Sequence, residues 1–221
     1  LIPDINLTPY SIWLATVVVS GISYLSYLLK RYVFHESGTL VSGIIGGLYS
    51  STATISVLAR KSRKASEQEA TDYVAAMLLA VSMMFLRFMI LILIFSREIF
   101  LSIYPYLLTM AVVAAIVAWF IHSRQKRPED QSAETEEDDS SNPLEFKVAL
   151  IFAILFVIFT FLTHYTLVYA GTGGLNLLSF VSGFSDITPF ILNLLQNTGS
   201  VAALIITACS MQAIISNIMV N

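Results

Sequence analysis

Seven apolar segments, each about as long as a helix that spans a bilayer, dominate the sequence. They cover residues 10–29, 37–59, 73–95, 99–121, 148–170, 174–196 and 200–220. A membrane-spanning helix needs about 20 predominantly apolar residues. Only 12% of the residues are charged, whereas a soluble domain has about 25%. The chain therefore predicts an all-α polytopic membrane protein, and its composition excludes a nucleic-acid-binding protein and an ordinary cytosolic enzyme.

A polar stretch at residues 122–146 separates the fourth and fifth segments. It carries an acidic run from Glu129 to Asp139, and such a composition cannot bury a core. We expect a linker here, between a first part at 1–121 and a second part at 147–221. The chain starts at Leu1, without a methionine or a basic signal region, and we expect it to be a piece of a longer protein.

The second and sixth segments differ from the others, because helix-weakening residues interrupt each near its middle. In a helix interior glycine costs about 1 kcal/mol and proline about 3 kcal/mol. The expected helix breaks are Gly46 and Gly47 in the second segment, and Gly183 and Pro189 in the sixth. Gly43 and Gly47 also have the Gly-x-x-x-Gly spacing that lets two helices approach closely. Close packing therefore remains an alternative for the second segment.

An internal repeat relates the two interrupted segments. A shift of 136 residues places Gly47 on Gly183 and Thr52 on Thr188. The chain then consists of a span, an interrupted segment and a span, followed by an extra span, the linker and the same three elements again. Paired interrupted segments in corresponding positions are typical of the binding site of a transporter.

The distribution of Lys and Arg distinguishes two topologies. If all seven segments cross, eight basic residues lie on one side and three on the other. If the second and sixth segments are re-entrant hairpins, the division is ten to one, with Arg97 alone opposite. The ten are Lys30, Arg31, Arg60, Lys61, Arg63, Lys64, Arg124, Lys126, Arg127 and Lys147. The positive-inside rule favours the hairpins and two inverted halves, and seven full spans with parallel halves remain the alternative.

Two opposite charges are left at membrane depth, Arg87 in the third segment and Asp186 in the sixth. Either one alone costs at least about 2.5–3.5 kcal/mol at a helix centre, so we expect the two charges to be coupled across the two halves. Two alternatives stay open. Arg87 could snorkel toward the near interface, and Asp186 could cap a half-helix next to Pro189.

Oxygen-bearing side chains gather around the two expected breaks. Hard cations prefer oxygen ligands, so we expect these residues to bind an ion or another substrate. They are Ser50, Ser51, Thr52, Thr54, Ser185, Asp186, Thr188 and Asn217. The same hydroxyl groups could equally bond to the backbone in a tight bend.

These features predict a transporter or channel-like domain for a small inorganic cation or a proton-coupled ion. The alternative is a non-transporting membrane module that regulates or binds another membrane protein. A transporter needs a polar path from its centre to each face, whereas such a module needs only a packed centre. No nucleophile–base pair and no metal-ligand spacing is readable, so we expect neither an enzyme nor a cofactor.

The residues around the second segment resemble a known family. The core Gly46-Gly47-x-x-Ser50-Ser51-Thr52-Ala53-Thr54, with Arg87, Asn142-Pro143, Gly183-x-x-Asp186 and Asn217, is similar to the bacterial membrane domain of unknown function 4010. The resemblance implies a multi-pass protein of the bacterial inner membrane, with an MgtC/SapB-type domain preceding this one. Thr188 stands where the family often has a second acid. This difference argues against a metal site with two carboxylates. We expect the lipid bilayer as a partner and a homo-oligomer as the assembly.

Overall fold

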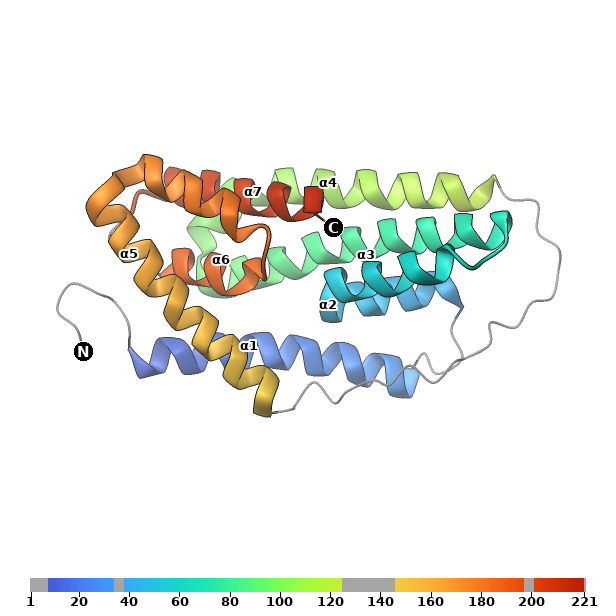
Figure 1. Cartoon of the computed structure of the whole chain (residues 1–221), viewed down its shortest axis with the longest axis horizontal. Helices are drawn as coiled ribbons and strands as arrows, with labels where there is room; N and C mark the ends of the chain where they lie inside the picture. The colour runs from blue at the N-terminus through green and yellow to red at the C-terminus, as the bar shows by residue number, and fades with distance from the viewer. Residues whose placement is uncertain (1–7, 34–37, 125–145, 197–200, 221) are drawn as a thin grey trace. The chain divides into compact units, whose positions relative to one another are not determined.

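The computed structural model describes residues 8–33, 38–124, 146–196 and 201–220 (Figure 1). Within these ranges all regular elements are helical. They are α1 (Pro9–Leu28), the short π-helical turn η1 (Leu29–Val33), α2 (Thr39–Ser62), α3 (Glu67–Phe95), α4 (Arg97–Ser123), α5 (Phe146–Ser182), α6 (Ile187–Gln196) and α7 (Ala203–Val220). The prediction of an all-α protein is confirmed, whereas most of the expected linker, residues 125–145, lies outside the described residues.

Six of these helices, α1 to α5 and α7, are long and apolar enough to cross a membrane. The shorter α6 has ten residues, which is about 15 Å of helix and half of a hydrocarbon core. The helix lengths thus separate one short element from six helices of membrane-spanning length.

Polar side chains fix where several helices begin. The backbone N–H of Ser11 donates to Oγ1 of Thr8 at 3.1 Å, which makes Thr8 the N-cap of α1 and leaves Pro9 in the first position, where proline is favoured. Ser66 and Glu69 form a capping box before α3. The N–H of Ser66 donates to Oε2 of Glu69 at 2.9 Å, and the N–H of Glu69 donates to Oγ of Ser66 at 3.4 Å.

Contacts between residues divide the chain into two compact units. Unit 1 contains residues 1–20, 89–105 and 144–221, and unit 2 contains residues 21–88 and 106–143. Helices α1, α3 and α4 contribute residues to both units, whereas α2 belongs to unit 2 and α5 to α7 belong to unit 1. Each interrupted segment therefore lies in a different unit.

In unit 2, α3 and α4 run antiparallel. Oγ of Ser82 donates to the carbonyl of Ala111 at 2.8 Å, and Nδ1 of His122 lies 2.9 Å from Oδ1 of Asp72. The residue numbers of these contacts increase along α3 and decrease along α4, which is the pattern of two antiparallel helices.

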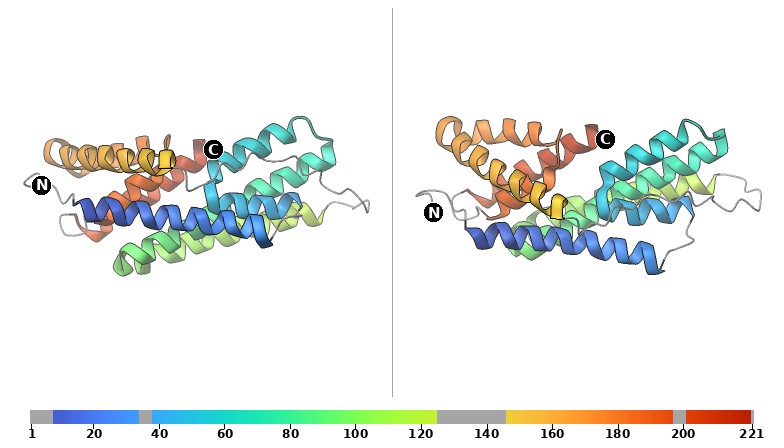
Figure 2. Two further views of the ribbon diagram at one scale, coloured as in Figure 1. Left: turned by 90° about the horizontal axis from the view of Figure 1, so that it is seen from below. Right: turned by 60° about the horizontal axis from the view of Figure 1, so that its bottom comes forward.

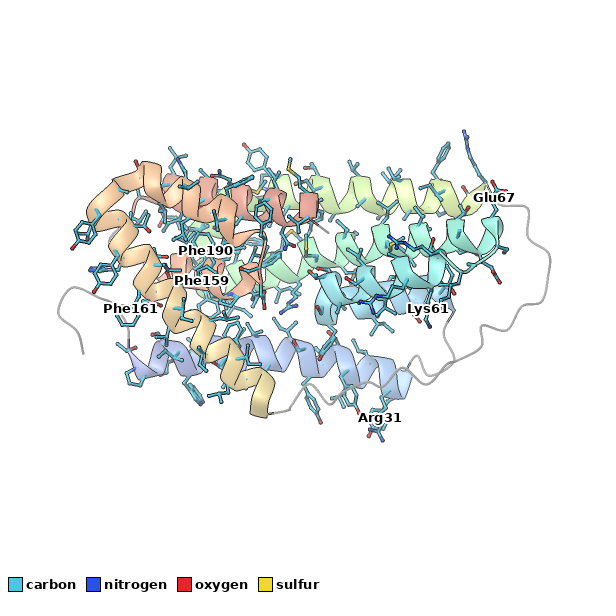
Figure 3. All side chains as sticks on the ribbon, viewed as in Figure 1. Arg31, Lys61, Glu67, Phe159, Phe161 and Phe190 are labelled. Atoms are coloured by element: carbon cyan, nitrogen blue, oxygen red, sulfur yellow. The ribbon has the colours of Figure 1, made fainter. Side chains whose placement is uncertain are left out.

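In unit 1, α5 bends at Gly171, whose φ of +58° lies in the left-handed region that favours glycine. This bend separates the expected fifth and sixth segments. Beyond it the helix continues to Ser182, and after a turn the chain returns as α6 (Figures 1 and 2). Figure 3 shows Phe159 of α5 facing Phe190 of α6, with ring centroids 5.6 Å apart. All residues from Ile187 to Leu195 are buried, so α6 is an interior element of this bundle.

Helix α7 packs alongside the last part of α5 and runs parallel to it. Sγ of Cys209 donates to Oδ1 of Asn176 at 3.4 Å. Further along both helices, Oγ of Ser216 donates to the carbonyl of Phe180 at 2.8 Å. The contacts advance in the same direction on both helices, and they end at the turn that follows Ser182.

Candidate functional site: two broken helices

The first break lies in the middle of α2, at Ser50. This residue has φ −157° and ψ 103°, an extended conformation inside an otherwise helical element. Its Oγ accepts a hydrogen bond from the N–H of Ala53 at 3.4 Å, so Ser50 is the N-cap of the second arm. The break divides α2 into a first arm that ends at Tyr49 and a second arm that begins at Ser51.

The two arms of α2 fold back on each other. A Cβ added to Gly46 would lie 2.5 Å from Oγ1 of Thr54. In one continuous helix these residues would be about 12 Å apart along the axis. The ribbons of the two arms accordingly leave the break toward the same end of the unit (Figures 1 and 2), and Gly46 lets them approach each other near the break.

Arg87 of α3 binds the end of the first arm. Its Nη1 donates to the backbone carbonyl of Tyr49 at 2.8 Å, and the side chain is half-buried. The last carbonyls of a helix have no partner within the helix, and a cation is favourable at this negative end of the helix dipole. The guanidinium is therefore directed at the helix break, which differs from the snorkelling alternative.

Close packing through Gly43 and Gly47 is present as well. A Cβ on Gly47 would lie 2.5 Å from Cα of Ala80, and one on Gly43 would overlap the carbonyl oxygen of Ala76. The first arm of α2 thus touches the backbone of α3 through its glycines. Close packing and a broken helix therefore both occur in this segment, because the glycines allow the packing and the chain leaves the helix at Ser50.

The position of this break differs from the prediction. Gly46 and Gly47 are helical, and the non-helical residue is Ser50. Glycine only weakens a helix, whereas a serine that can cap the following arm lowers the free energy of interrupting it. The hydroxyl residues also separate, because Ser51 is buried, Thr54 is half-buried against Gly46, and Thr52 is exposed.

The second break lies between α5 and α6. The N–H groups of Gly183, Phe184 and Ser185 donate to the carbonyls three residues earlier, at 3.0–3.2 Å, and close the end of α5. Oδ1 of Asp186 then accepts from the N–H of Thr188 at 3.0 Å. Asp186 is therefore the N-cap of α6, as its capping alternative predicts.

Pro189 does not break a helix here. It is the third residue of α6, where the backbone N–H has no acceptor inside the helix and its loss costs little. The prediction of a break at Pro189 is corrected, since the chain leaves the helix at Gly183 and re-enters it at Ile187.

Asn217 of α7 ties the second break together. Its Nδ2 donates to the carbonyl of Gly183 at 3.0 Å and to that of Ser185 at 3.5 Å, and the side chain is 6% exposed. A Cβ on Gly183 would overlap the side chain of Ser216. Gly183 is therefore needed for close contact with α7, and Asn217 supplies donors that α5 lacks at its end.

Asp186 has more hydrogen-bonding capacity than its role as an N-cap requires. Asp186 is exposed and uses one carboxylate oxygen in the cap, whereas Thr188 is buried. A cap needs only one acceptor oxygen, so a carboxylate at this place supplies more acceptor capacity and more charge than capping requires.

Sequence reasoning missed a buried polar pair. Nδ2 of Asn193 in α6 donates to Oγ1 of Thr160 in α5 at 2.7 Å, and the two residues are 1% and 3% exposed. Oγ1 of Thr160 in turn donates to the carbonyl of Phe156. In the sequence, Asn193 is the one polar residue in the otherwise apolar run from Phe190 to Leu195. That context is the signal by which it could have been found.

Among the described residues, no three His, Cys, Asp or Glu side chains come together as metal ligands. The oxygen donors near the breaks are instead hydroxyl groups, backbone carbonyls and Asp186. These residues form two sets, one in unit 2 around Ser50 and Arg87, the other in unit 1 around Asp186 and Asn217.

Six helices of membrane-spanning length, two of them interrupted or bent, define an all-helical multi-pass membrane protein. The chain matches the family described as Domain of unknown function (DUF4010) over residues 17–221, and it belongs to that family. This confirms the resemblance, although the match begins after the first residues of the chain. No curated protein and no solved structure matches the chain.

Proposed function

We propose that this chain is a transport domain of the bacterial inner membrane for a small inorganic cation or a proton-coupled ion. The observation that carries the proposal is that both helix breaks are stabilised in the same way. A serine or aspartate caps the returning arm, and a side-chain N–H group of the next helix donates to a backbone carbonyl at the end of the preceding arm. Irregular backbone at membrane depth is tolerated where it is buried in protein or lines a cavity, and secondary transporters place their substrate sites there.

The internal repeat is supported by the chemistry of three pairs of positions. Under the shift of 136 residues, Gly47 corresponds to Gly183, Tyr49 to Ser185 and Ser50 to Asp186. Each glycine touches the next helix, and the carbonyl of each second residue accepts a side-chain hydrogen bond from that helix. Each third residue is an N-cap. Correspondence of role at equal spacing is stronger support than the identities alone.

In this proposal α2, and the end of α5 with α6, are re-entrant hairpins. The fold-back of α2 at Ser50 supports it, because the two ends of a folded-back helix lie on the same side. The basic residues at 30–31 and 60–64 then share one side, and ten of the eleven basic residues outside membrane depth face the cytoplasm. The two halves are inverted, and their hairpins enter from opposite faces.

Each break offers oxygen atoms of the kind that a hard cation prefers as ligands. At the second break Asp186 supplies the negative charge and Thr188 a hydroxyl, and at the first break Ser51, Thr52 and Thr54 supply hydroxyls. The proposal includes two partners, an MgtC/SapB-type domain on the N-terminal side and further copies of this chain.

The test is uptake into proteoliposomes that contain the purified protein. A panel of Na⁺, K⁺, Mg²⁺ and protons, the last followed with an internal pH dye, is compared with liposomes that contain Asp186→Asn. We expect flux of one of these ions with the wild-type protein and none with the variant. A well-folded protein that moves no ion of the panel would contradict the proposal and favour the non-transporting membrane module.

A further inference from the structure

Helix α7 carries polar side chains along one face. Thr207, Ser210 and Asn217 are spaced by three and seven residues, which places them within an arc of about 80° around a helix of 3.6 residues per turn. Asn217 binds the second break. Ser210 and Thr207 lie about 10 Å and 15 Å before it along the axis. The polar face thus leads from the break toward the beginning of α7.

Two of these side chains have a buried hydroxyl oxygen without a hydrogen-bond partner in the described part of the chain. Oγ of Ser210, a residue that is 0% exposed, and Oγ1 of Thr207 are buried atoms with no hydrogen-bond partner among the described residues. Elsewhere in the same bundle, the hydroxyls of Thr160, Ser179 and Ser182 donate to carbonyls of their own helix. An unsatisfied hydroxyl is costly away from water, and buried water commonly satisfies such groups.

Helices α5 and α6 add polar groups in the same bundle. Oγ1 of Thr163 is buried and has no partner in the described part of the chain, and it lies one turn after Thr160, which binds Asn193. Helix α6 starts at the break and ends shortly before α7 begins. Asn193 on α6 and Ser210 on α7 therefore both lie on the same side of the break, toward the end of the bundle at which α7 begins.

We propose that water molecules occupy the interior of the α5–α6–α7 bundle and form a polar path from Asp186 toward the end at which α7 begins. The inference rests on the proposed function, for which it supplies one of the two access paths. In the hairpin topology the path opens on the non-cytoplasmic side. Its members are Asn217, Ser210 and Thr207 of α7, Asn193 of α6 and Thr163 of α5.

Accessibility to a small aqueous ion tests the path. In a Cys209→Ala background, single cysteines replace Ser210, Thr207 and, as a matched control, Ile215, which is 40% exposed on another face of α7. Proteoliposomes are treated with Ag⁺, and thiols that remain free are then alkylated under denaturing conditions and counted by mass spectrometry. We expect Ag⁺ to protect the cysteines of Ser210→Cys and Thr207→Cys, and to leave that of Ile215→Cys alkylated. Equal alkylation of all three would overturn the proposal.

A second measurement does not depend on the added thiol. If water binds the hydroxyl, Ser210→Ala breaks a water-mediated network and lowers the melting temperature of the protein. If the hydroxyl is dry, the substitution removes an unsatisfied group, and a melting temperature that holds or rises overturns the path. Neither readout requires transport, so an absence of ion flux with protected cysteines would remove the proposed function alone. Flux without protection would remove the path alone.

Discussion

Nη1 of Arg87 donates a hydrogen bond of 2.8 Å to the backbone carbonyl of Tyr49, the last residue before α2 leaves the helix at Ser50. The two residues are 38 positions apart in the sequence. This bond joins two features that are each costly in a membrane, a half-buried cation and a carbonyl without a helical partner. The cation gains a hydrogen-bond acceptor and the carbonyl gains a donor. A change of either group alone is therefore expected to lower the stability of the protein.

Replacement of Arg87 by methionine is expected to destabilise the protein by about 1.5–3 kcal/mol, the usual contribution of a hydrogen bond to a charged group. Arg87→Lys keeps the charge and one donor, and it should recover part of that loss. Thermal unfolding in detergent measures both. Arg97→Met is the matched control, because Arg97 is exposed at the start of α4, and its loss should stay within about 0.5 kcal/mol. Equal effects of Arg87→Met and Arg97→Met would contradict the assigned role.

The glycines at the two breaks should tolerate no side chain. Gly183→Ala places a Cβ against Ser216, and Gly47→Ala places one against the backbone of Ala80. We expect losses of about 1–3 kcal/mol, as for other overpacked sites. Gly21→Ala has nothing within 4 Å of the added Cβ and should be neutral or stabilising by up to about 1 kcal/mol. Unfolding temperatures of the three variants make the comparison, and similar values for all three would refute the close approach.

Sequence reasoning predicted the helical class, the long apolar helices and the presence of two interruptions, because long apolar runs and clusters of glycine are visible in the sequence. It did not predict that the fifth segment and the start of the sixth form one bent helix, α5. It misplaced the interruption of α2 by three or four residues. The break depends on which residue can cap the returning arm. The sequence allows Ser50 either to bind an ion or to bond to the backbone in a bend, and it does not single out this serine among its neighbours. The assignment of a break to Pro189 failed for a related reason, because the effect of proline depends on its position in the helix.

The hydrogen bonds that stabilise the breaks were harder to predict. The sequence predicts Arg87 as a charge partner and Asn217 as an ion-binding residue, but their acceptors are backbone carbonyls of Tyr49, Gly183 and Ser185. Every residue has such a carbonyl, so no pattern in the sequence marks the acceptor. Only the folded arms of each break determine which carbonyls lack a helical partner.

The topology predicts which ends of the helices share one side of the membrane. Single cysteines at Tyr32 and Arg63, both exposed, should react with an impermeant thiol reagent from the cytoplasmic side in oriented vesicles. A cysteine at Glu98, the second residue of α4, should react only from the other side. If Tyr32 and Arg63 were labelled from opposite sides, α2 would cross the membrane and the seven-span topology would replace the hairpins.

Asp186 has two expected roles, and two substitutions separate them. Asparagine retains an oxygen that can accept the N–H of Thr188, whereas alanine does not. Asp186→Asn should therefore change stability by only a few tenths of a kcal/mol, and Asp186→Ala should lose about 1 kcal/mol, the usual value of an N-cap. Asn217→Ala, which removes the donor to Gly183 and Ser185, should destabilise the same break without removing charge. Thermal unfolding of the three variants isolates the structural role.

Ion flux isolates the second role. If Asp186 only caps α6, flux should follow stability, so that Asp186→Asn stays active and Asp186→Ala loses part of its flux. If the charge binds the cation, Asp186→Asn should abolish flux while its unfolding temperature stays near that of the wild-type protein, because an amide is a far weaker ligand for a hard cation than a carboxylate. We expect the second outcome. The reason is the comparison of the two breaks. The hydroxyl of Ser50 is sufficient to cap the returning arm of α2, so capping alone does not require the negative charge of Asp186.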